Sequence, residues 1–107
     1  MATGVVTLFC TFPTTDLAGQ VATTLVEERL AACVNLIPKV TSIYRWEGEV
    51  AQETEALAII KTTQERSPDL QKRLVELHEY KCPEVIELPV SSGLKEYLQW
   101  VGDVVGK

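Results

Sequence analysis

The stretch from Cys33 to Ile60 constrains the fold most, because much of it alternates between apolar and polar residues. A side-chain period of two over residues 33–46 is typical of a β-strand. Residues 47–49 (Glu-Gly-Glu) suit a tight turn, after which residues 50–60 return as a partner strand. Pro38 cannot donate a hydrogen bond to a neighbouring strand, so we expect a bulge or bend there. The stretch therefore predicts a long β-hairpin.

We expect this hairpin to extend beyond the rest of the protein. A dozen residues at ~3.3 Å each span roughly 40 Å, more than a chain of 107 residues covers with its own helices. Exposed apolar strands are prone to aggregation. We therefore expect another subunit to cover the outer half of the hairpin. The alternation is expected to place one set of side chains of the first strand on one face and a second set on the other. The first set is Val34, Leu36, Val40, Tyr44 and Trp46, and the second is Asn35, Lys39, Thr41 and Arg45.

The remaining residues predict two more strands and three helices. A β-branched and aromatic run predicts a buried first strand over residues 5–12, and residues 85–88 predict a short fourth strand. One helix is expected after Thr14 or Thr15, and a second begins with Ser67 as its N-cap and stops before Pro83. The last helix follows Gly93. Its apolar residues are expected on one side, and they are Leu94, Tyr97, Leu98, Val101, Val104 and Val105.

The element order is strand–helix–strand–strand–helix–strand–helix, which predicts an α+β fold. This order is typical of the ferredoxin-like split βαβ sandwich, βαββαβ, with one C-terminal helix added. The length fits a single domain over residues 1–107.

Composition excludes several classes of partner. The net charge of −5 argues against nucleic acid, which needs clustered positive charge. A membrane span is not expected, since no run of eighteen apolar residues occurs, and the N-terminus lacks the features of a signal peptide. We therefore expect a soluble, cytoplasmic protein. The three cysteines form no Cys-x-x-Cys pair, so buried, reduced thiols are the expectation.

Several motifs resemble the signature of the CutA family, the divalent-cation tolerance proteins. The main ones are residues 28–35 (ERLAACVN) and 41–48 (TSIYRWEG). Further matches follow in the same order at residues 59–62 (IIKT), 83–86 (PEVI), 88–90 (LPV) and 97–100 (YLQW). The resemblance implies a cytoplasmic, ferredoxin-like homotrimer shaped like the PII-type signalling proteins, with the hairpin running between neighbouring subunits. It also implies a role in tolerance to metal ions, with copper binding proposed for some members.

The resemblance also implies a metal site. Cys10 matches a thiol ligand proposed for the family and His78 matches the second of two adjacent histidines, but Leu77 stands at the first. A thiolate and an imidazole suit copper or zinc, and Cys82, four residues beyond His78, could add a second thiolate. The alternative is structural, because a cysteine on a buried strand and a histidine ending a helix commonly have no ligand role.

A second group of residues is placed by the resemblance near clefts between subunits. Its members are Trp46, Lys61, Tyr80, Glu84, Tyr97 and Trp100. The alternative for Lys61 and Glu84 is a solvated lysine and an ordinary ion pair.

The sequence contains no recognisable catalytic set. A Ser-His-Asp or Cys-His relay would have to use the only histidine, and no phosphate-binding loop or His-Glu-x-x-His motif occurs. We therefore do not expect an enzyme. Two functions remain: a metal-responsive, possible copper-binding protein, and a PII-like trimeric signalling or scaffolding module that binds a small ligand or a partner protein at its clefts.

Overall fold

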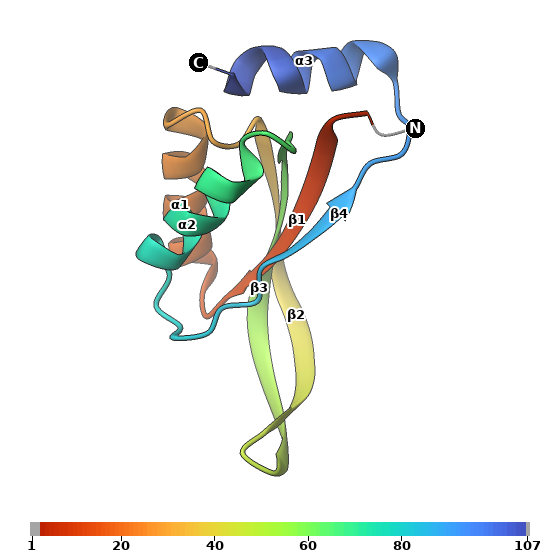
Figure 1. The fold of residues 1–107 in the computed structure, drawn as a ribbon. Helices are drawn as coiled ribbons and strands as arrows, with labels where there is room; N and C mark the ends of the chain where they lie inside the picture. The colour runs from red at the N-terminus through yellow and green to blue at the C-terminus, as the bar shows by residue number, and fades with distance from the viewer. Residues whose placement is uncertain (1–2, 107) are drawn as a thin grey trace.

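The computed structural model describes residues 3–106 and has the predicted order of elements (Figure 1). The elements are β1 (Val5–Phe12), α1 (Thr15–Glu27), β2 (Cys33–Trp46), β3 (Glu49–Thr63), α2 (Ser67–Leu77), β4 (Ile86–Pro89) and α3 (Lys95–Val105). The strands form one sheet in the order β2-β3-β1-β4, and every neighbouring pair is antiparallel. This arrangement confirms the ferredoxin-like α+β fold with an added C-terminal helix.

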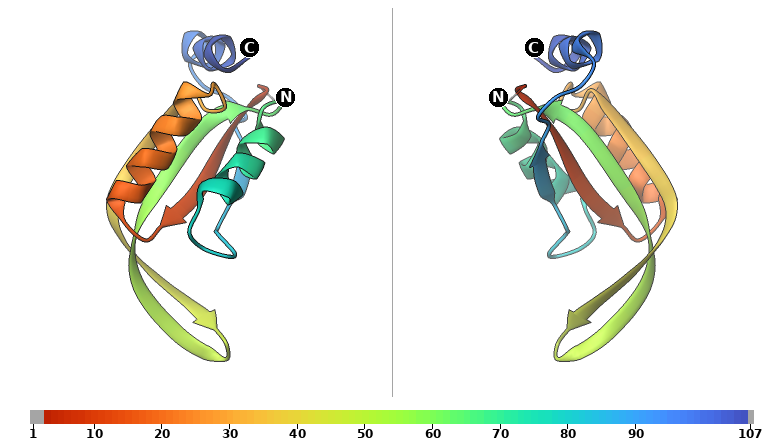
Figure 2. Two further views of the ribbon diagram at one scale, coloured as in Figure 1. Left: turned by 90° about the vertical axis from the view of Figure 1, so that its left-hand side faces the viewer. Right: turned by 90° about the vertical axis from the view of Figure 1, so that its right-hand side faces the viewer.

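Two helices cover one face of the sheet. Figure 2 shows α1 and α2 side by side on that face, and the core lies between them and the strands. Leu8, Cys10 and Phe12 point into this core from β1. The opposite face, called here the open face, is not covered by α1 or α2. Across the end of the sheet lies α3, where Val101 and Val105 pack with Val5 and Ala32 (Figure 1).

The helix starts follow the sequence at α1 but not at α2. Thr14 caps α1, its hydroxyl accepting a hydrogen bond from the amide of Leu17 at 3.1 Å, as predicted. The expected N-cap role of Ser67 is wrong, because α2 begins at Ser67 itself and Arg66 occupies the cap position. The hydroxyl of Ser67 is buried and donates to Glu87 of β4 instead, which satisfies a polar group that has left water.

The start of α3 also differs from expectation. The sequence pattern places Leu94 on the apolar side of this helix, but it precedes the helix in an extended conformation and is 71% exposed. The burial of α3 instead comes from Val101 and Val105, with Leu98 and Val104 partly buried beside them. A side chain in front of the first turn does not share the helical period, which is why the pattern is misleading there.

The bulge predicted at Pro38 is present and reverses the alternation of β2. From Ile37 to Val40 β2 advances three residues, while β3 advances two, from Leu57 to Glu55. One extra residue moves all later side chains to the opposite face. The prediction of one common face is therefore wrong: Val34 and Leu36 pack against the core, whereas Val40, Tyr44 and Trp46 lie on the open-face side.

The hairpin projects from the molecule as predicted (Figure 1). Its tip is a two-residue turn in which Glu47 and Gly48 both have positive φ, at 51° and 84°. Such turns match the twist of the flanking strands. The projection accounts for much of the longest dimension of the molecule, 44 Å against 28 and 22 Å.

The cysteines differ in exposure, which corrects the expectation of three buried thiols. All three are free, but only Cys10 is buried; Cys33 is half-buried and Cys82 is exposed. Cys82 follows the helix layer in the connection to β4, where the chain runs along the surface. Within residues 3–106, no helix is long and apolar enough to cross a membrane.

Candidate functional site

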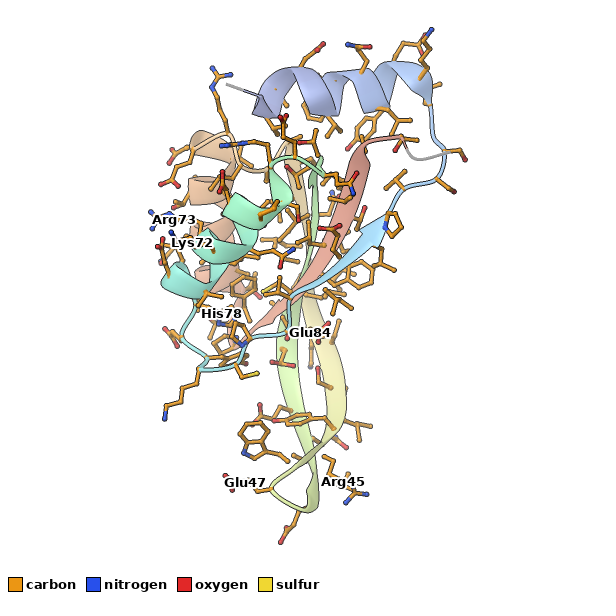
Figure 3. The ribbon with its side chains drawn as sticks, in the orientation of Figure 1. Arg45, Glu47, Lys72, Arg73, His78 and Glu84 are labelled. Carbon is orange, nitrogen blue, oxygen red and sulfur yellow. The ribbon has the colours of Figure 1, made fainter. Side chains whose placement is uncertain are left out.

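A cleft of about 600 Å³ begins at the root of the hairpin, where the connection from α2 to β4 passes β1 and β3, and runs along the strands to Trp46 beside the tip. Figure 3 shows Glu84 at this root, far from Arg45 and Glu47 at the tip. The lining side chains come from the hairpin, from the end of β1 and from the connection. They are Thr11, Ser42, Ile43, Tyr44, Trp46, Glu53, Glu55, Tyr80, Lys81, Cys82 and Glu84.

The cleft is lined on one side by a buried carboxylate, that of Glu55. Glu55 is only 8% exposed, and the hydroxyl of Tyr80 donates a hydrogen bond to its Oε2 atom at 2.7 Å. Burial, followed by this hydrogen bond, raises the pKa of Tyr80, so the phenol remains a donor at neutral pH. Within residues 3–106, no lysine or arginine forms an ion pair with Glu53, Glu55 or Glu84.

A row of three aromatic rings, Phe12, His78 and Tyr80, leads from the core to the cleft. Phe12 and His78 are parallel, with ring centroids 4.5 Å apart, and Tyr80 follows His78 at 4.7 Å. The Nε2 atom of His78 lies 2.7 Å from the carbonyl oxygen of Thr11, and its Nδ1 atom accepts from the amide of Tyr80 at 3.1 Å. The first contact requires a proton on Nε2 and the second a lone pair on Nδ1, so these contacts fit the neutral ring.

The same contacts bear on the metal ligands that the sequence suggested. To bind a metal ion at this pair, the histidine must offer a free nitrogen lone pair and the cysteine must be a thiolate. Both nitrogens of His78 are engaged within the chain, and Cys10 is fully buried. Burial, with smaller contributions from the charges of Glu84 and Glu55, raises the pKa of the Cys10 thiol to about 12. As folded, this pair does not fit a metal ion.

Over residues 3–106, no group of three or more His, Cys, Asp or Glu side chains is placed to hold a metal ion. Cys82, suggested as a further thiolate, lies on the surface beside Glu84 in the lining of the cleft.

The structure divides the six predicted cleft residues into two groups. Trp46, Tyr80 and Glu84 line the cleft at the hairpin root. The other three, Lys61, Tyr97 and Trp100, lie near the opposite end of β2 and β3 and on α3.

The second group gathers around the start of β2. Lys61 is the cross-strand partner of Cys33, and its ammonium group donates to the side chain of Asn35. Burial, followed by the neighbouring Cys33 thiol, raises the pKa of Tyr97, whose ring centroid is 5.5 Å from that of Trp100. This group therefore forms a separate aromatic surface.

Sequence reasoning missed Glu53 and Glu55 as site residues. Both alternate toward the cleft from β3, directly before the apolar run that starts at Ala56. A signal was present, since a glutamate that continues the period of a buried strand is unusual. Tyr44 is predicted on the hairpin, and the bulge turns it toward this cleft.

The open face carries an apolar row across the sheet. Ile86 pairs with Phe9, and Phe9 pairs with Ile59, so the three side chains share this face. Leu88 and Ile37 extend the row, and Ile86, Leu88 and Ile37 remain 40–50% exposed. An apolar sheet face of this kind is typical of an interaction surface.

Comparison with known proteins identifies similar chains. The sequence profile of a family described as CutA1 divalent ion tolerance protein matches residues 6–104. The divalent-cation tolerance protein CutA of Thermus thermophilus is 48% identical over 96 residues, which cover 90% of this chain and 93% of that protein. A solved structure of the divalent cation tolerance protein (Cut A1) from Thermus thermophilus has a TM-score of 0.93 at 45% identity, covering 95% of this chain and 99% of that one.

Vertebrate relatives are longer than this chain. Human protein CutA is 47% identical over 96 residues, covering 90% of this chain and 54% of its own length. A CutA homologue of Xenopus laevis is 44% identical over 97 residues, covering 91% of this chain and 64% of its own length. The chain thus spans about half to two thirds of these relatives.

Proposed function

The chain belongs to the CutA1 divalent ion tolerance protein family, and on that premise we propose that it acts as a cytoplasmic homotrimer in the response to divalent metal ions. The proposed action is binding rather than catalysis. The observation that carries the assembly is the open face, whose apolar row continues along the hairpin to Tyr44 and Trp46. The number of three subunits comes from the family resemblance.

Burial of this surface supplies the driving force for assembly. Covering one large apolar side chain contributes roughly 1.5–3 kcal/mol, and a closed ring repeats each contact at every interface. Trp46 is 57% exposed in the single chain, and Phe9 lies at the centre of the apolar row. Both side chains therefore have exposed apolar surface that contact with a neighbouring copy would bury.

Sedimentation equilibrium of the purified protein at micromolar concentration tests the assembly. We expect a trimer, with Trp46→Asp and Phe9→Asp each weakening it. Val75→Asp is the matched control, because Val75 is equally exposed (56%) but lies on α2, away from the open face. A monomeric parent protein, or equal weakening by Val75→Asp, would contradict the proposal.

Copper is the metal that the resemblance suggests, and zinc suits the same thiolate and imidazole ligands. Binding at Cys10 and His78 would require His78 to release Thr11 or Tyr80, or ligands to come from different copies. Metal analysis after dialysis against Cu²⁺ or Zn²⁺ tests this. A stoichiometric ion lost in Cys10→Ala and His78→Ala, but kept in Cys82→Ser, would support that site. Retention of the ion in both alanine variants would place it elsewhere.

The cleft favours a second function, that of a PII-like trimeric signalling or scaffolding module with a small ligand. Its volume of about 600 Å³ falls within the range of small-molecule sites. A ligand that binds only the native state raises the unfolding temperature, so a thermal-shift screen detects it.

A further inference from the structure

We infer that two hydrogen bonds fix the direction in which the hairpin leaves the sheet, and that Thr15 and Tyr80, which donate them, are positioning residues for assembly. The inference rests on the proposed function above, in which the hairpin contacts a neighbouring copy, and it adds the contacts that hold the hairpin in place. Both contacts lie within a single chain, so their effect on the hairpin is measurable without assembly.

The hairpin loses its third strand at the level of the bulge. β1 pairs with β3 as far as Phe12 and Ala56, and beyond that pair, among the strands within residues 3–106, β3 pairs only with β2. Residues 38 and 39, which form the bulge, lie opposite the same Ala56. A bulge bends and twists its strand, and a two-stranded ribbon twists more than a wider sheet. The direction of the hairpin is therefore decided at this level.

The length of the hairpin makes this direction important. Trp46 lies about seven residues beyond the bulge, roughly 23 Å at ~3.3 Å per residue. A rotation of about 10° at the bulge would move Trp46 by about 4 Å, as much as the distance between side chains in contact. The hairpin must therefore be held within a few degrees to present Tyr44 and Trp46 to a neighbouring copy.

The first hydrogen bond holds the hairpin at β2. The hydroxyl of Thr15, the first residue of α1, donates to the carbonyl oxygen of Pro38 at 3.2 Å. Figure 2 shows the start of α1 beside β2 at the place where the hairpin leaves the sheet. Thr14 supplies the cap of α1, so the hydroxyl of Thr15 joins the helix to the bulge instead.

The second hydrogen bond holds the hairpin at β3. The hydroxyl of Tyr80, in the connection from α2 to β4, donates to Glu55 at 2.7 Å. Glu55 is the next residue after Ala56 in the direction of the tip. Each strand of the hairpin is thus attached, at the level of the bulge, to a different element. One attachment would leave the ribbon able to twist about it, and two attachments on different strands resist that twist.

The two contacts differ in how strongly they affect the folded state. Thr15 and Pro38 are both exposed, so water replaces the partner that is lost when their hydrogen bond is removed. Removing the hydroxyl of Tyr80 instead leaves the buried carboxylate of Glu55 without its donor. Thr15 therefore allows the direction of the hairpin to be tested with little change in the stability of the chain.

Sedimentation equilibrium of the full chain tests the effect on assembly. Thr15→Val keeps the shape of the side chain without its hydroxyl, and Thr15→Ser keeps the hydroxyl. The lost hydrogen bond is expected to count for about threefold in each chain, so the trimer association constant of Thr15→Val should fall about thirtyfold over three copies. Thr15→Ser should associate like the parent protein. Thr23→Val is the matched control, because the hydroxyl of Thr23 donates within α1, to the carbonyl of Gly19.

Time-resolved fluorescence anisotropy of Trp46 measures the motion of the hairpin directly. Trp100→Phe leaves Trp46 as the only tryptophan, and Phe9→Asp is added to separate the copies. In this background Thr15→Val and Tyr80→Phe should each lower the residual anisotropy of Trp46, because the hairpin then moves over a wider angle on the nanosecond timescale. The two substitutions together should lower it further.

The two measurements distinguish this inference from the assembly itself. An unchanged Trp46 anisotropy in Thr15→Val, or an unchanged association constant of that variant in a protein that forms trimers, overturns the inference and leaves the assembly intact. A monomeric parent protein contradicts the assembly, and the anisotropy then decides whether Thr15 holds the hairpin. Equal effects of Thr23→Val or Thr15→Ser would also overturn the inference, since neither variant removes the hydroxyl that reaches Pro38.

Discussion

The ring of His78 lies parallel to that of Phe12, with an interplanar angle of 11° and a centroid separation of 4.5 Å. This stack places the end of α2 against the last residue of β1. The two nitrogens of His78 then fix the main chain at Thr11 and at Tyr80. His78 is therefore a positioning residue for the cleft wall.

Replacing His78 should loosen this wall. His78→Ala removes one hydrogen bond donor and one acceptor as well as the stack, and we expect a loss of about 1–3 kcal/mol in the free energy of unfolding. Urea denaturation measures it. Glu79→Ala, next in sequence and outside the ring stack, is the control. A stability unchanged from the parent would contradict the positioning role.

The hydrogen bond between Tyr80 and Glu55 predicts a coupling in stability. Tyr80→Phe leaves the buried carboxylate of Glu55 without its donor, at an expected cost of about 1–3 kcal/mol. Adding Glu55→Gln removes the charge and should recover part of this loss. A double-mutant cycle by urea denaturation measures the coupling. Strictly additive effects would show that the two side chains do not interact energetically.

The raised pKa of Cys10 predicts a loss of stability in alkali. The thiol pKa is about 12 in the folded protein and ordinarily near 9, so the unfolded state releases the proton first. This contribution is fully present below pH 9 and is lost as the pH rises from 9 toward 12. At pH 10 the loss is about 1–2 kcal/mol relative to pH 8. Urea denaturation at both pH values should show a smaller pH effect in Cys10→Ala than in the parent protein. Equal pH effects would contradict the prediction.

The hairpin tip predicts a stabilising substitution. Glu47 has a φ of 51°, a left-handed conformation that asparagine adopts more readily than glutamate. Glu47→Asn, followed by the native Gly48, should stabilise the protein by about 0.5–1 kcal/mol. Thermal unfolding at one fixed protein concentration measures this. Gly48→Ala, at φ 84°, should have the opposite sign.

Local patterns predicted the elements, and distant contacts decided the exceptions. The bounds of β2 and the cap at Thr14 depend on neighbours in sequence and were confirmed. The number of residues in the bulge was not predictable from the local pattern. The bulge also makes a distant contact, in which the hydroxyl of Thr15 in α1 donates a hydrogen bond to the carbonyl oxygen of Pro38 at 3.2 Å. The partner of Ser67 lies twenty residues away in Glu87.

The candidate site was predicted in part for the same reason. The family resemblance places Trp46 and Tyr80 near clefts between subunits, and the structure brings both to the lining of one cleft with Glu84. Glu55 was missed because glutamate is ordinarily solvated, and its hydrogen-bond partner Tyr80 lies twenty-five residues away in the sequence. Lys61 lies outside this cleft and donates a hydrogen bond to the side chain of Asn35 on the neighbouring strand. The order of the family motifs in the sequence does not reveal such a contact between strands.

The bulge allows β2 to lose one residue without losing its pairing with β3. Residues 38 and 39 of β2 lie opposite the single residue Ala56, since Ile37 pairs with Leu57 and Val40 pairs with Glu55. Deleting Lys39 would therefore leave a regular ladder in which Val40 still pairs with Glu55, and Tyr44 and Trp46 would keep their face of the sheet. The deletion would remove the local bend and the added twist that a bulge gives to its strand. The direction in which the hairpin leaves the sheet should therefore change, while the faces of its side chains stay the same.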